Sequence, residues 1–333
     1  MSGVKRSIRR QSASRWKWPT GQSSPVQDRR TPVGLTLPRV SEECPACGQD
    51  AAALSLTVEE AYRLWRCRSC GSEFFRADDP GRAPRESAYW EPYKFSVYDN
   101  PAVHAEFERR YERVVAEAER LVGPIRSVLD TGCGIGNFLA YASDRGMRAV
   151  GADVEEKAVD AARRRGLEAY LPDDIDRHVA DGSLDAATMW DVIEHMLDPQ
   201  AGLEAMVRKV RPGGVLLFET PNAGFPARRA VLSLHALSGQ RINLTDPLYY
   251  LEHRCYFTLE GMKSLLERCG CRTVWSAIAP SPRQKMATLF ELEGKDDLLK
   301  RALGRAWPVL ETSTTRLRLG NKLLLVGQRM NER

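Results

Sequence analysis

A run of twelve residues, 128–139, constrains the fold of this chain more than any other feature. An apolar segment leads into an acid and then into three alternating glycines, Gly132, Gly134 and Gly136. Because glycine has no Cβ, the backbone can turn sharply there and approach a bound ligand closely. Residues 137–145 continue as a predicted helix, so the run predicts a cofactor site at the end of a strand.

The spacing of these glycines indicates which cofactor is excluded. A dinucleotide fingerprint is G-x-G-x-x-G or A, and the sixth position counted from Gly132 is Asn137. The third glycine therefore comes one residue early, at 136, and the spacing counts against NAD.

With Asp130 as its acid, the run resembles motif I of the class I S-adenosylmethionine (SAM) methyltransferases, (D/E)-x-G-x-G-x-G. Asp153 ends the next predicted strand and matches the acid that holds the ribose hydroxyls in this family, although a solvated strand-end aspartate is the alternative. Asp174 is expected near the adenine amino group, and Trp190 either lines the methionine end or packs in the core. The resemblance implies these cofactor-binding residues: Asp130, Gly132, Cys133, Gly134, Gly136, Asn137, Asp153, Val154, Asp174 and Trp190.

Two later segments extend the resemblance. Residues 191–199 match D-x-x-E-H-x-x-D-P, and residues 210–222 match K-P-G-G followed by T-P-N, with Arg211 in place of the usual lysine. Both are similar to the subgroup that contains the quinone-biosynthesis O-methyltransferases. The resemblance runs from about residue 125 to residue 222 and implies a Rossmann-like α/β fold with a seven-stranded sheet.

Alternating apolar segments and helices predict parallel strands joined by right-handed crossovers. The resemblance adds an antiparallel sixth and seventh strand, strand 7 being the reversed strand of the family. An insertion at 223–258 is expected to border the active site, because it leaves the carboxyl end of strand five, and a second insertion spans 280–320. The seven predicted strands are 127–130, 148–152, 167–170, 185–190, 214–219, 272–279 and 321–328.

Three residues are candidates for catalysis. His195 follows the fourth strand and is the leading candidate base, with Glu194 or Asp191 able to orient it or to bind a divalent ion. The E-x-x-E-H run of the quinone-biosynthesis enzymes has been tied to such an ion, but Asp191 replaces the first glutamate here. His195 could instead brace the loop. His253 matches an H-x-x-x-F-(S/T) segment that faces the pocket in this subgroup.

Two C-x-x-C-G pairs, separated by 19 residues, predict a zinc ribbon near the N-terminus. Two-residue gaps let both thiolates of a pair reach one ion, and four sulfurs complete a closed tetrahedral site, so the zinc is expected to be structural. Disulfides are the alternative and suit an oxidising compartment. The predicted ligands are Cys44, Cys47, Cys67 and Cys70.

The sequence therefore divides into four parts: 1–40, a ribbon at 41–80, an aromatic linker and capping helix at 81–123, and a methyltransferase domain at 124–333. The first part carries a net charge of +8 and leaves −3 for the rest. It is expected to be a disordered, solvated tail, with a transit peptide or weak nucleic-acid affinity as alternatives. The chain lacks an apolar run long enough for a membrane span, so a cytoplasmic protein is expected.

Three functions are compatible with these features. The favoured one is methyl transfer from SAM to a small-molecule acceptor, most plausibly at oxygen, because the Asn-Pro-Pro-aromatic motif for base nitrogens is absent. The second is an RNA or protein methyltransferase in which ribbon and tail bind the polymer; the near-neutral ribbon favours a docking or substrate-covering role instead. The third is a non-enzymatic SAM- and zinc-binding module. The ribbon is expected to mediate either a dimer or an internal lid.

Overall fold

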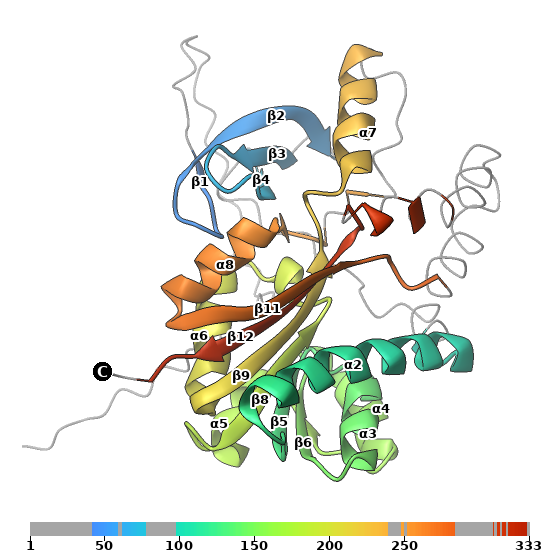
Figure 1. The fold of residues 1–333 in the computed structure, drawn as a ribbon, viewed down its shortest axis with the longest axis vertical. Helices are drawn as coiled ribbons and strands as arrows, with labels where there is room; N and C mark the ends of the chain where they lie inside the picture. The colour runs from blue at the N-terminus through green and yellow to red at the C-terminus, as the bar shows by residue number, and fades with distance from the viewer. Residues whose placement is uncertain are drawn as a thin grey trace, which may run out of the picture.

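The computed structural model describes residues 42–58, 62–77, 98–238, 248–249, 252–283, 309, 312–313, 315–317 and 319–331. A small antiparallel sheet from the N-terminal part lies over one end of a larger mixed sheet (Figure 1). The predicted basic tail and most of the aromatic linker lie outside the described residues, as does most of the 280–320 insertion.

The larger sheet has the order β11-β12-β9-β8-β5-β6-β7, and every strand except β12 points the same way. This confirms the seven-stranded fold and the reversed seventh strand. The prediction that the sixth strand is also antiparallel is wrong: β11 pairs antiparallel with β12, so β11 runs parallel to the other five. Helix α8 (Leu259–Arg268) is the crossover that returns the chain to the end of the sheet at which the parallel strands begin, so β11 can run parallel to them. Strand β12 then lies between β11 and β9. The strands are β5 (Ser127–Thr131), β6 (Arg148–Ala152), β7 (Ala169–Tyr170), β8 (Leu184–Trp190), β9 (Val210–Pro221), β11 (Cys271–Ala279) and β12 (Lys322–Arg329).

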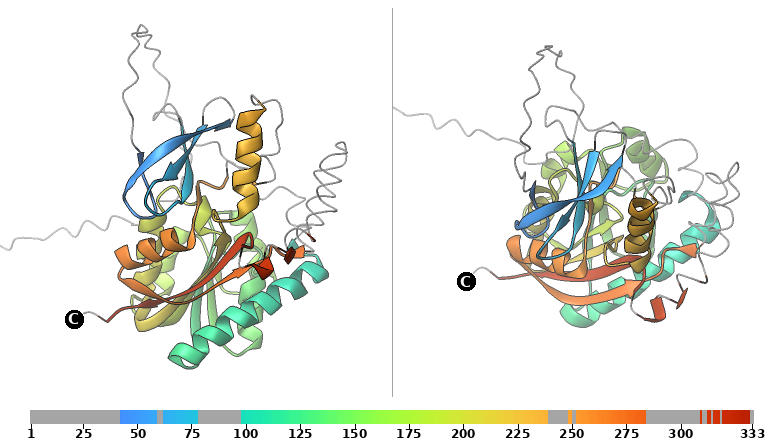
Figure 2. Two further views of the ribbon diagram at one scale, coloured as in Figure 1. Left: turned by 45° about the horizontal axis from the view of Figure 1, so that its top comes forward. Right: turned by 90° about the horizontal axis from the view of Figure 1, so that it is seen from above.

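Helices cover both faces of this sheet (Figures 1 and 2). One face buries residues of α2, α3 and α4, and the other buries residues of α5, α6 and α8. Asn100 caps the N-terminus of helix α2, because its side chain accepts a hydrogen bond from Ala102 N at 2.9 Å, and Gly123 caps the C-terminus. No helix within the described ranges has both the length and the apolarity to cross a bilayer. The helices are α2 (Pro101–Val122), α3 (Asn137–Asp144), α4 (Glu156–Arg164), α5 (Ile175–His178), α6 (Pro199–Lys209), α7 (Pro226–Leu237) and α8.

The smaller sheet joins the two predicted domains. Its strands are β1 (Glu42–Glu43), β2 (Asp50–Val58), β3 (Tyr62–Cys67), β4 (Glu73–Ala77) and β10 (Cys255–Tyr256). The last of these comes from the 223–258 insertion and pairs antiparallel with β4. The ribbon therefore shares a sheet with the catalytic domain.

Side chains reinforce this junction. The hydroxyl of Thr258 donates to the carbonyl of Cys70 at 2.6 Å, and the backbone N–H of Thr258 donates to Ser72 Oγ at 3.2 Å. Gly261 lets α8 approach closely, since a Cβ there would lie 2.0 Å from Ser72 Oγ. The ribbon is thus docked on the N-terminus of α8.

Candidate functional site

The glycine loop connects β5 to α3 at the carboxyl end of the parallel strands. Gly132 and Gly134 have φ angles of 73° and 53°, in the left-handed region that disfavours other residues. A Cβ at Gly132 would also lie 2.4 Å from the side chain of Val192. The loop is therefore bent sharply over the edge of the sheet, as its sequence predicts.

Asp153 lies directly beside this loop. Its Oδ2 accepts a hydrogen bond from Gly134 N at 2.8 Å, and its Oδ1 accepts one from Glu155 N at 2.9 Å. The residue is 6% exposed, and burial raises its pKa to about 6. Two backbone donors fix the orientation of the carboxylate, while each oxygen keeps lone pairs for hydroxyl groups of a ligand.

Asp130, the acid of the glycine motif, is buried inside the sheet. Thr188 Oγ1 donates to its Oδ1 at 2.6 Å. Burial raises the pKa of Asp130 to about 8, and the nearby charge of Asp153 acts in the same direction. Cys133, three residues further along the loop, is also buried. Asp130 therefore supports the loop from inside the sheet, and near neutral pH its buried carboxyl is mostly protonated.

The other predicted cofactor residues have different surroundings. The side chain of Asn137 donates to the carbonyl of Tyr98 at 3.0 Å and accepts from Arg165 at 2.9 Å, so it anchors neighbouring segments. Val154 is 51% exposed next to Asp153. Asp174 lies after β7, and its carboxylate pairs with Arg177 at the surface.

Trp190 is packed in an aromatic cluster behind the loop. Its ring centroid lies 4.7 Å from that of Tyr111 and 5.3 Å from that of Phe138. The buried Nε1 atom of Trp190 has no hydrogen-bond partner among the described residues. The cluster connects α2 and α3 to the end of β8.

The three candidate catalytic residues come together at the same sheet edge. The rings of His195 and His253 have centroids 4.6 Å apart, and His195 Nδ1 lies 2.9 Å from the carbonyl oxygen of Glu252. Because a carbonyl only accepts, Nδ1 carries the proton and Nε2 is the basic nitrogen. Burial lowers the pKa of His253 well below its usual value, and the charge of His195 adds to this effect.

Glu194 lies beneath the two histidines and is fully buried. Thr220 Oγ1 donates to its Oε2 at 2.9 Å, while Oε1 has no hydrogen-bond partner in the described part of the chain. Burial raises the pKa of Glu194 to about 8. Ligand atoms of Glu194, His195 and His253 lie within 4.8 Å of one another, a grouping that could hold a metal ion.

Asp191 does not belong to this group. Its carboxylate forms a buried ion pair with Lys322, and its backbone φ of 56° lies in the left-handed region. Lys322 also lies 3.9 Å from Glu219, which accepts from Arg110 at 2.7 Å. The third group beside Glu194 and His195 is therefore His253, and not Asp191.

The four predicted zinc ligands converge in the ribbon, as the spacing of the pairs requires. The Sγ atoms of Cys44 and Cys70 are 3.7 Å apart, and those of Cys47 and Cys67 are 3.4 Å apart. Four sulfurs held about 2.3 Å from one tetrahedral zinc ion would be separated by about 3.8 Å. Backbone N–H groups of Ser69 and Cys70 point at Cys67 Sγ from 3.4 Å, an arrangement that suits a thiolate. The residues present therefore fit zinc.

Sequence reasoning missed Thr220, Lys322 and Arg228. Thr220 lies within the strand that the T-P-N motif ends, where the motif itself was a usable signal. Lys322 was detectable as a lone charge opening the apolar run of β12. Arg228 lies in α7, within an insertion that matches no motif.

Comparison with known proteins agrees with this geometry. A family model described as a methyltransferase domain matches residues 103–276, more than half of the chain. Ubiquinone biosynthesis O-methyltransferase of Vibrio parahaemolyticus is 31% identical over 120 residues, which cover 34% of this chain and 50% of that protein. Malonyl-[acyl-carrier protein] O-methyltransferase of Serratia marcescens is 36% identical over 113 residues, which cover 32% of this chain and 44% of that protein.

The chain spans about half the length of the curated relatives that it matches. Among solved structures, a SAM dependent methyltransferase from Archaeoglobus fulgidus aligns with 72% of this chain and 100% of its own, at 19% identity and a TM-score of 0.47.

Proposed function

The chain belongs to the methyltransferase-domain family, and we propose that it transfers a methyl group from SAM to an oxygen atom of a small-molecule acceptor. The observation that carries this proposal is the placement of Asp153 and of the pair His195 and His253 along one sheet edge. The first site suits the cofactor and the second suits the acceptor. The printed names of two relatives, both O-methyltransferases, support oxygen as the acceptor atom.

In this proposal the glycine loop and Asp153 hold the cofactor. The carboxylate accepts hydrogen bonds from the two ribose hydroxyls, and exposed Val154 offers an apolar surface to the adenine. When bound, SAM supplies a methyl group that is already activated on a sulfonium. The protein therefore has two tasks, to position the acceptor in line with that methyl group and to take its proton.

His195 performs the second task. With Nδ1–H donated to Glu252, the Nε2 lone pair can accept the proton of an acceptor hydroxyl. The acceptor oxygen forms a bond to the methyl carbon while the carbon–sulfur bond breaks and its electron pair stays on sulfur. His253, kept neutral by its lowered pKa, adds no competing positive charge beside the base.

A divalent ion at Glu194, His195 and His253 is the second candidate for this step. Two histidines and a carboxylate suit a first-row transition metal, which would lower the pKa of an acceptor hydroxyl. Tetrahedral ligands about 2.1 Å from such an ion would be about 3.4 Å apart. The ligand atoms here all lie within 4.8 Å of one another, a spacing that allows such an ion. We favour the metal-free base because Asp191, which stands where the quinone-biosynthesis enzymes have the first glutamate of their E-x-x-E-H run, is paired with Lys322 instead.

The zinc ribbon would cover the acceptor site. Its strand β4 pairs with β10, which begins two residues after His253. Residues 41–80 contain four arginines and eight acidic residues, a net charge of −4, which gives little attraction for a nucleic-acid backbone. A fixed wall beside the histidines suits a small acceptor better than a long polymer.

The proposal is tested by following label from SAM labelled in its methyl group. The wild type and the variants His195→Ala and His178→Ala would be incubated with hydroxylated aromatic acids, with transfer RNA and alone. We expect label in the small molecules, a loss of about 100-fold or more in His195→Ala, and near-normal transfer with the exposed His178 changed. Label found only in RNA or in the protein would contradict the proposal.

Metal analysis of the same preparations separates the two candidates for proton removal. One zinc per chain, from the ribbon, agrees with the metal-free base. A second equivalent of metal that disappears in Glu194→Gln would assign the ion instead.

A further inference from the structure

Arg228, in the first turn of α7, is a buried cation with no acidic partner in the described part of the chain. The residue is only 2% exposed, and its Nε and Nη1 atoms have no hydrogen-bond partner there. Its guanidinium lies over two aromatic rings, 4.0 Å from the centroid of Tyr256 and 4.9 Å from that of Tyr249. The charge is therefore held by ring faces and not by a carboxylate.

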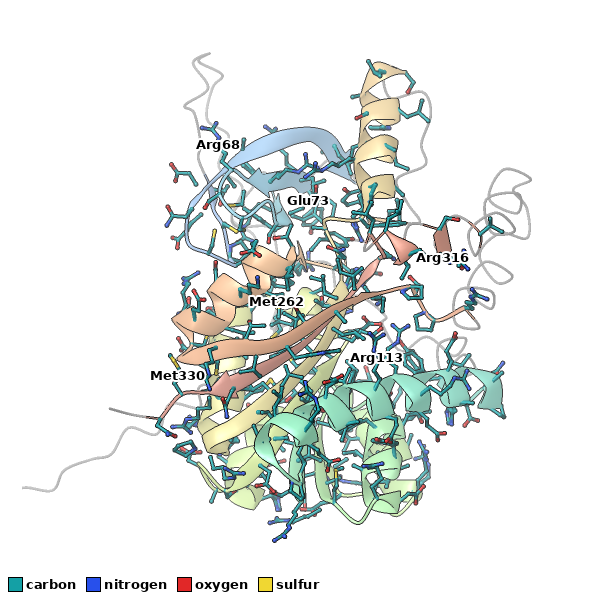
Figure 3. The ribbon with its side chains drawn as sticks, viewed as in Figure 1. Arg68, Glu73, Arg113, Met262, Arg316 and Met330 are labelled. Carbon is teal, nitrogen blue, oxygen red and sulfur yellow. The ribbon has the colours of Figure 1, made fainter. Side chains whose placement is uncertain are left out.

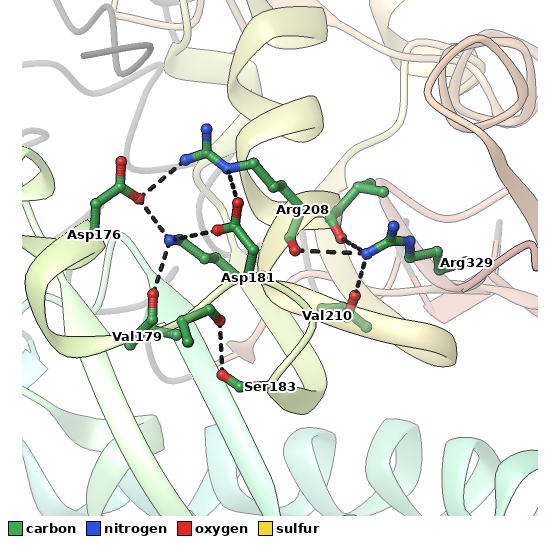
Figure 4. A network of polar contacts seen from close by, with 10 residues as sticks. Asp176, Val179, Asp181, Ser183, Arg208, Val210 and Arg329 are labelled. Atoms are coloured by element: carbon green, nitrogen blue, oxygen red, sulfur yellow. Dashed lines mark hydrogen bonds and ion pairs between the residues drawn. The ribbon is translucent and has the colours of Figure 1, made fainter. Parts of the chain in front are cut away.

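Other buried cations among the residues that the structure describes are paired. Lys209 is also 2% exposed, and its Nζ donates to Val179 O at 2.8 Å and meets Asp181 at 2.8 Å and Asp176 at 2.5 Å. Figure 4 shows both aspartates in that network together with Arg208. Lys322 pairs with Asp191 and Arg110 with Glu219 in the same way. Among these buried cations, Arg228 is the exception.

The exception is energetically costly. A guanidinium stays protonated in proteins, so Arg228 cannot escape the cost of burial by losing its proton. Cation–π contacts return only part of that cost, and each buried N–H without an acceptor adds to it. A buried polar group left in this state calls for an explanation, and a bound anion would supply both the charge and the acceptors.

The position of Arg228 relates it to the proposed acceptor site. Helix α7 follows directly on β9, whose carboxyl end borders that site. The ring of Tyr256, which stacks on Arg228, has its centroid 5.4 Å from that of His253, and His253 is in turn 4.6 Å from His195. An acceptor with its reacting oxygen at the histidines could thus direct another substituent toward Arg228.

The ribbon holds the aromatic rings in place around this cation. The hydroxyl of Tyr249 donates to Glu73 Oε2 at 2.8 Å, and Glu73 also accepts from Arg66 at 2.9 Å. Figure 3 shows Glu73 within the ribbon, next to the catalytic domain. Phe75 packs edge-on against Tyr249 and Tyr256, with both centroids 6.5 Å away. The site therefore combines the smaller sheet, α7 and Tyr249, whose hydroxyl is held by Glu73 of the ribbon.

We propose that Arg228 recognises an anionic group, a carboxylate or a phosphate, on the methyl acceptor. This inference rests on the proposed function, since it specifies the acceptor class of the same site. It also gives the ribbon a specific part, which is to orient Tyr249 on the face of the recognising guanidinium.

The test is calorimetry on protein loaded with S-adenosylhomocysteine, using benzoate, phenyl phosphate, inorganic phosphate and neutral benzamide as probes. The variants are Arg228→Met, which keeps an unbranched side chain against the rings, and Arg229→Met, its exposed neighbour on α7. We expect benzoate or phenyl phosphate to bind the wild type and Arg229→Met in a 1:1 complex. Binding to Arg228→Met should be at least about tenfold weaker, and benzamide should not bind.

Each other outcome is decisive. Equal binding by Arg228→Met, or no binding of either aryl anion to the wild type, overturns the inference. Binding of inorganic phosphate alone would show a site for a free ion and overturn recognition of the acceptor. Failure of the wild type to bind S-adenosylhomocysteine would contradict the proposed function. The anion titrations of the wild type and Arg228→Met would still decide whether Arg228 binds an anion.

Thermal unfolding in the absence of ligand guards against a misfolded variant. Removing an unpaired buried charge should leave the Tm of Arg228→Met unchanged or raise it. A clear fall in Tm would mean that Arg228 is a structural residue, and the inference would fail.

Discussion

Thr258 connects the ribbon to the catalytic domain, so Thr258→Ala should destabilise both together. The hydroxyl of Thr258 caps α8 by accepting from Gly261 N at 3.0 Å, and it donates to the Cys70 carbonyl at 2.6 Å. Loss of a threonine cap costs about 1 kcal/mol, and loss of the second hydrogen bond costs about 1 kcal/mol more. The free energy of unfolding should therefore fall by about 2 kcal/mol.

Urea unfolding followed by near-ultraviolet circular dichroism and by a zinc-sensitive dye would measure this effect. The two signals should change at the same urea concentration, because the ribbon and the catalytic domain share β10. Thr258→Ser, which keeps the hydroxyl, and Thr57→Ala, at an exposed ribbon position, should each change stability by less than about 0.5 kcal/mol. Equal effects of Thr258→Ala and Thr57→Ala, or zinc release well before the main transition, would refute the reasoning.

Three other outcomes follow from the site. Because burial raises the pKa of Asp153 to about 6, SAM affinity should fall up to about tenfold per pH unit below that value, and calorimetry should find weak, pH-insensitive binding in Asp153→Asn. Cys47→Ser should remove the zinc and increase amide hydrogen exchange in both β4 and β10, with no effect on exchange in β6. The pKa values of Asp130 and Glu194 are raised to about 8, so the folded protein holds more protons than the unfolded chain between about pH 4 and pH 8. The contribution of these two groups to the free energy of unfolding should therefore decline as the pH rises through this range. Urea titrations of the wild type and of Glu194→Gln, compared to isolate the contribution of Glu194, would contradict the burial argument if that contribution grew with pH.

The parallel sheet and the cofactor loop were predictable because their signals are local. An apolar run, an acid and glycines at fixed spacing specify a strand and a tight turn with little help from the rest of the chain. Gly132 and Gly134 have the positive φ angles that this spacing implies, and Asp153 lies beside them. The C-x-x-C pairs were equally informative, since their geometry depends on short loops.

The acceptor side was less predictable because long-range contacts build it. Strand β10 is only two residues long, and nothing in its sequence specifies β4 as its partner. No local pattern indicates that His253, and not Asp191, lies beside Glu194 and His195. That arrangement depends on the pairing of Asp191 with Lys322, which is 131 residues away in the chain. No sequence pattern indicates that Arg228 is buried. Its burial depends on the rings of Tyr249 and Tyr256, which come from other parts of the chain.

The most direct test of the account is calorimetric titration of SAM into the wild type, Asp153→Ala and Asp160→Ala. Asp160 is the matched control, an aspartate on α4 with a side chain that is 52% exposed. We predict one SAM per chain for the wild type and for Asp160→Ala, and at least about tenfold weaker binding for Asp153→Ala. No binding by the folded, zinc-loaded wild type, or equal binding by all three proteins, would contradict the assignment of the glycine loop and Asp153 as the cofactor site.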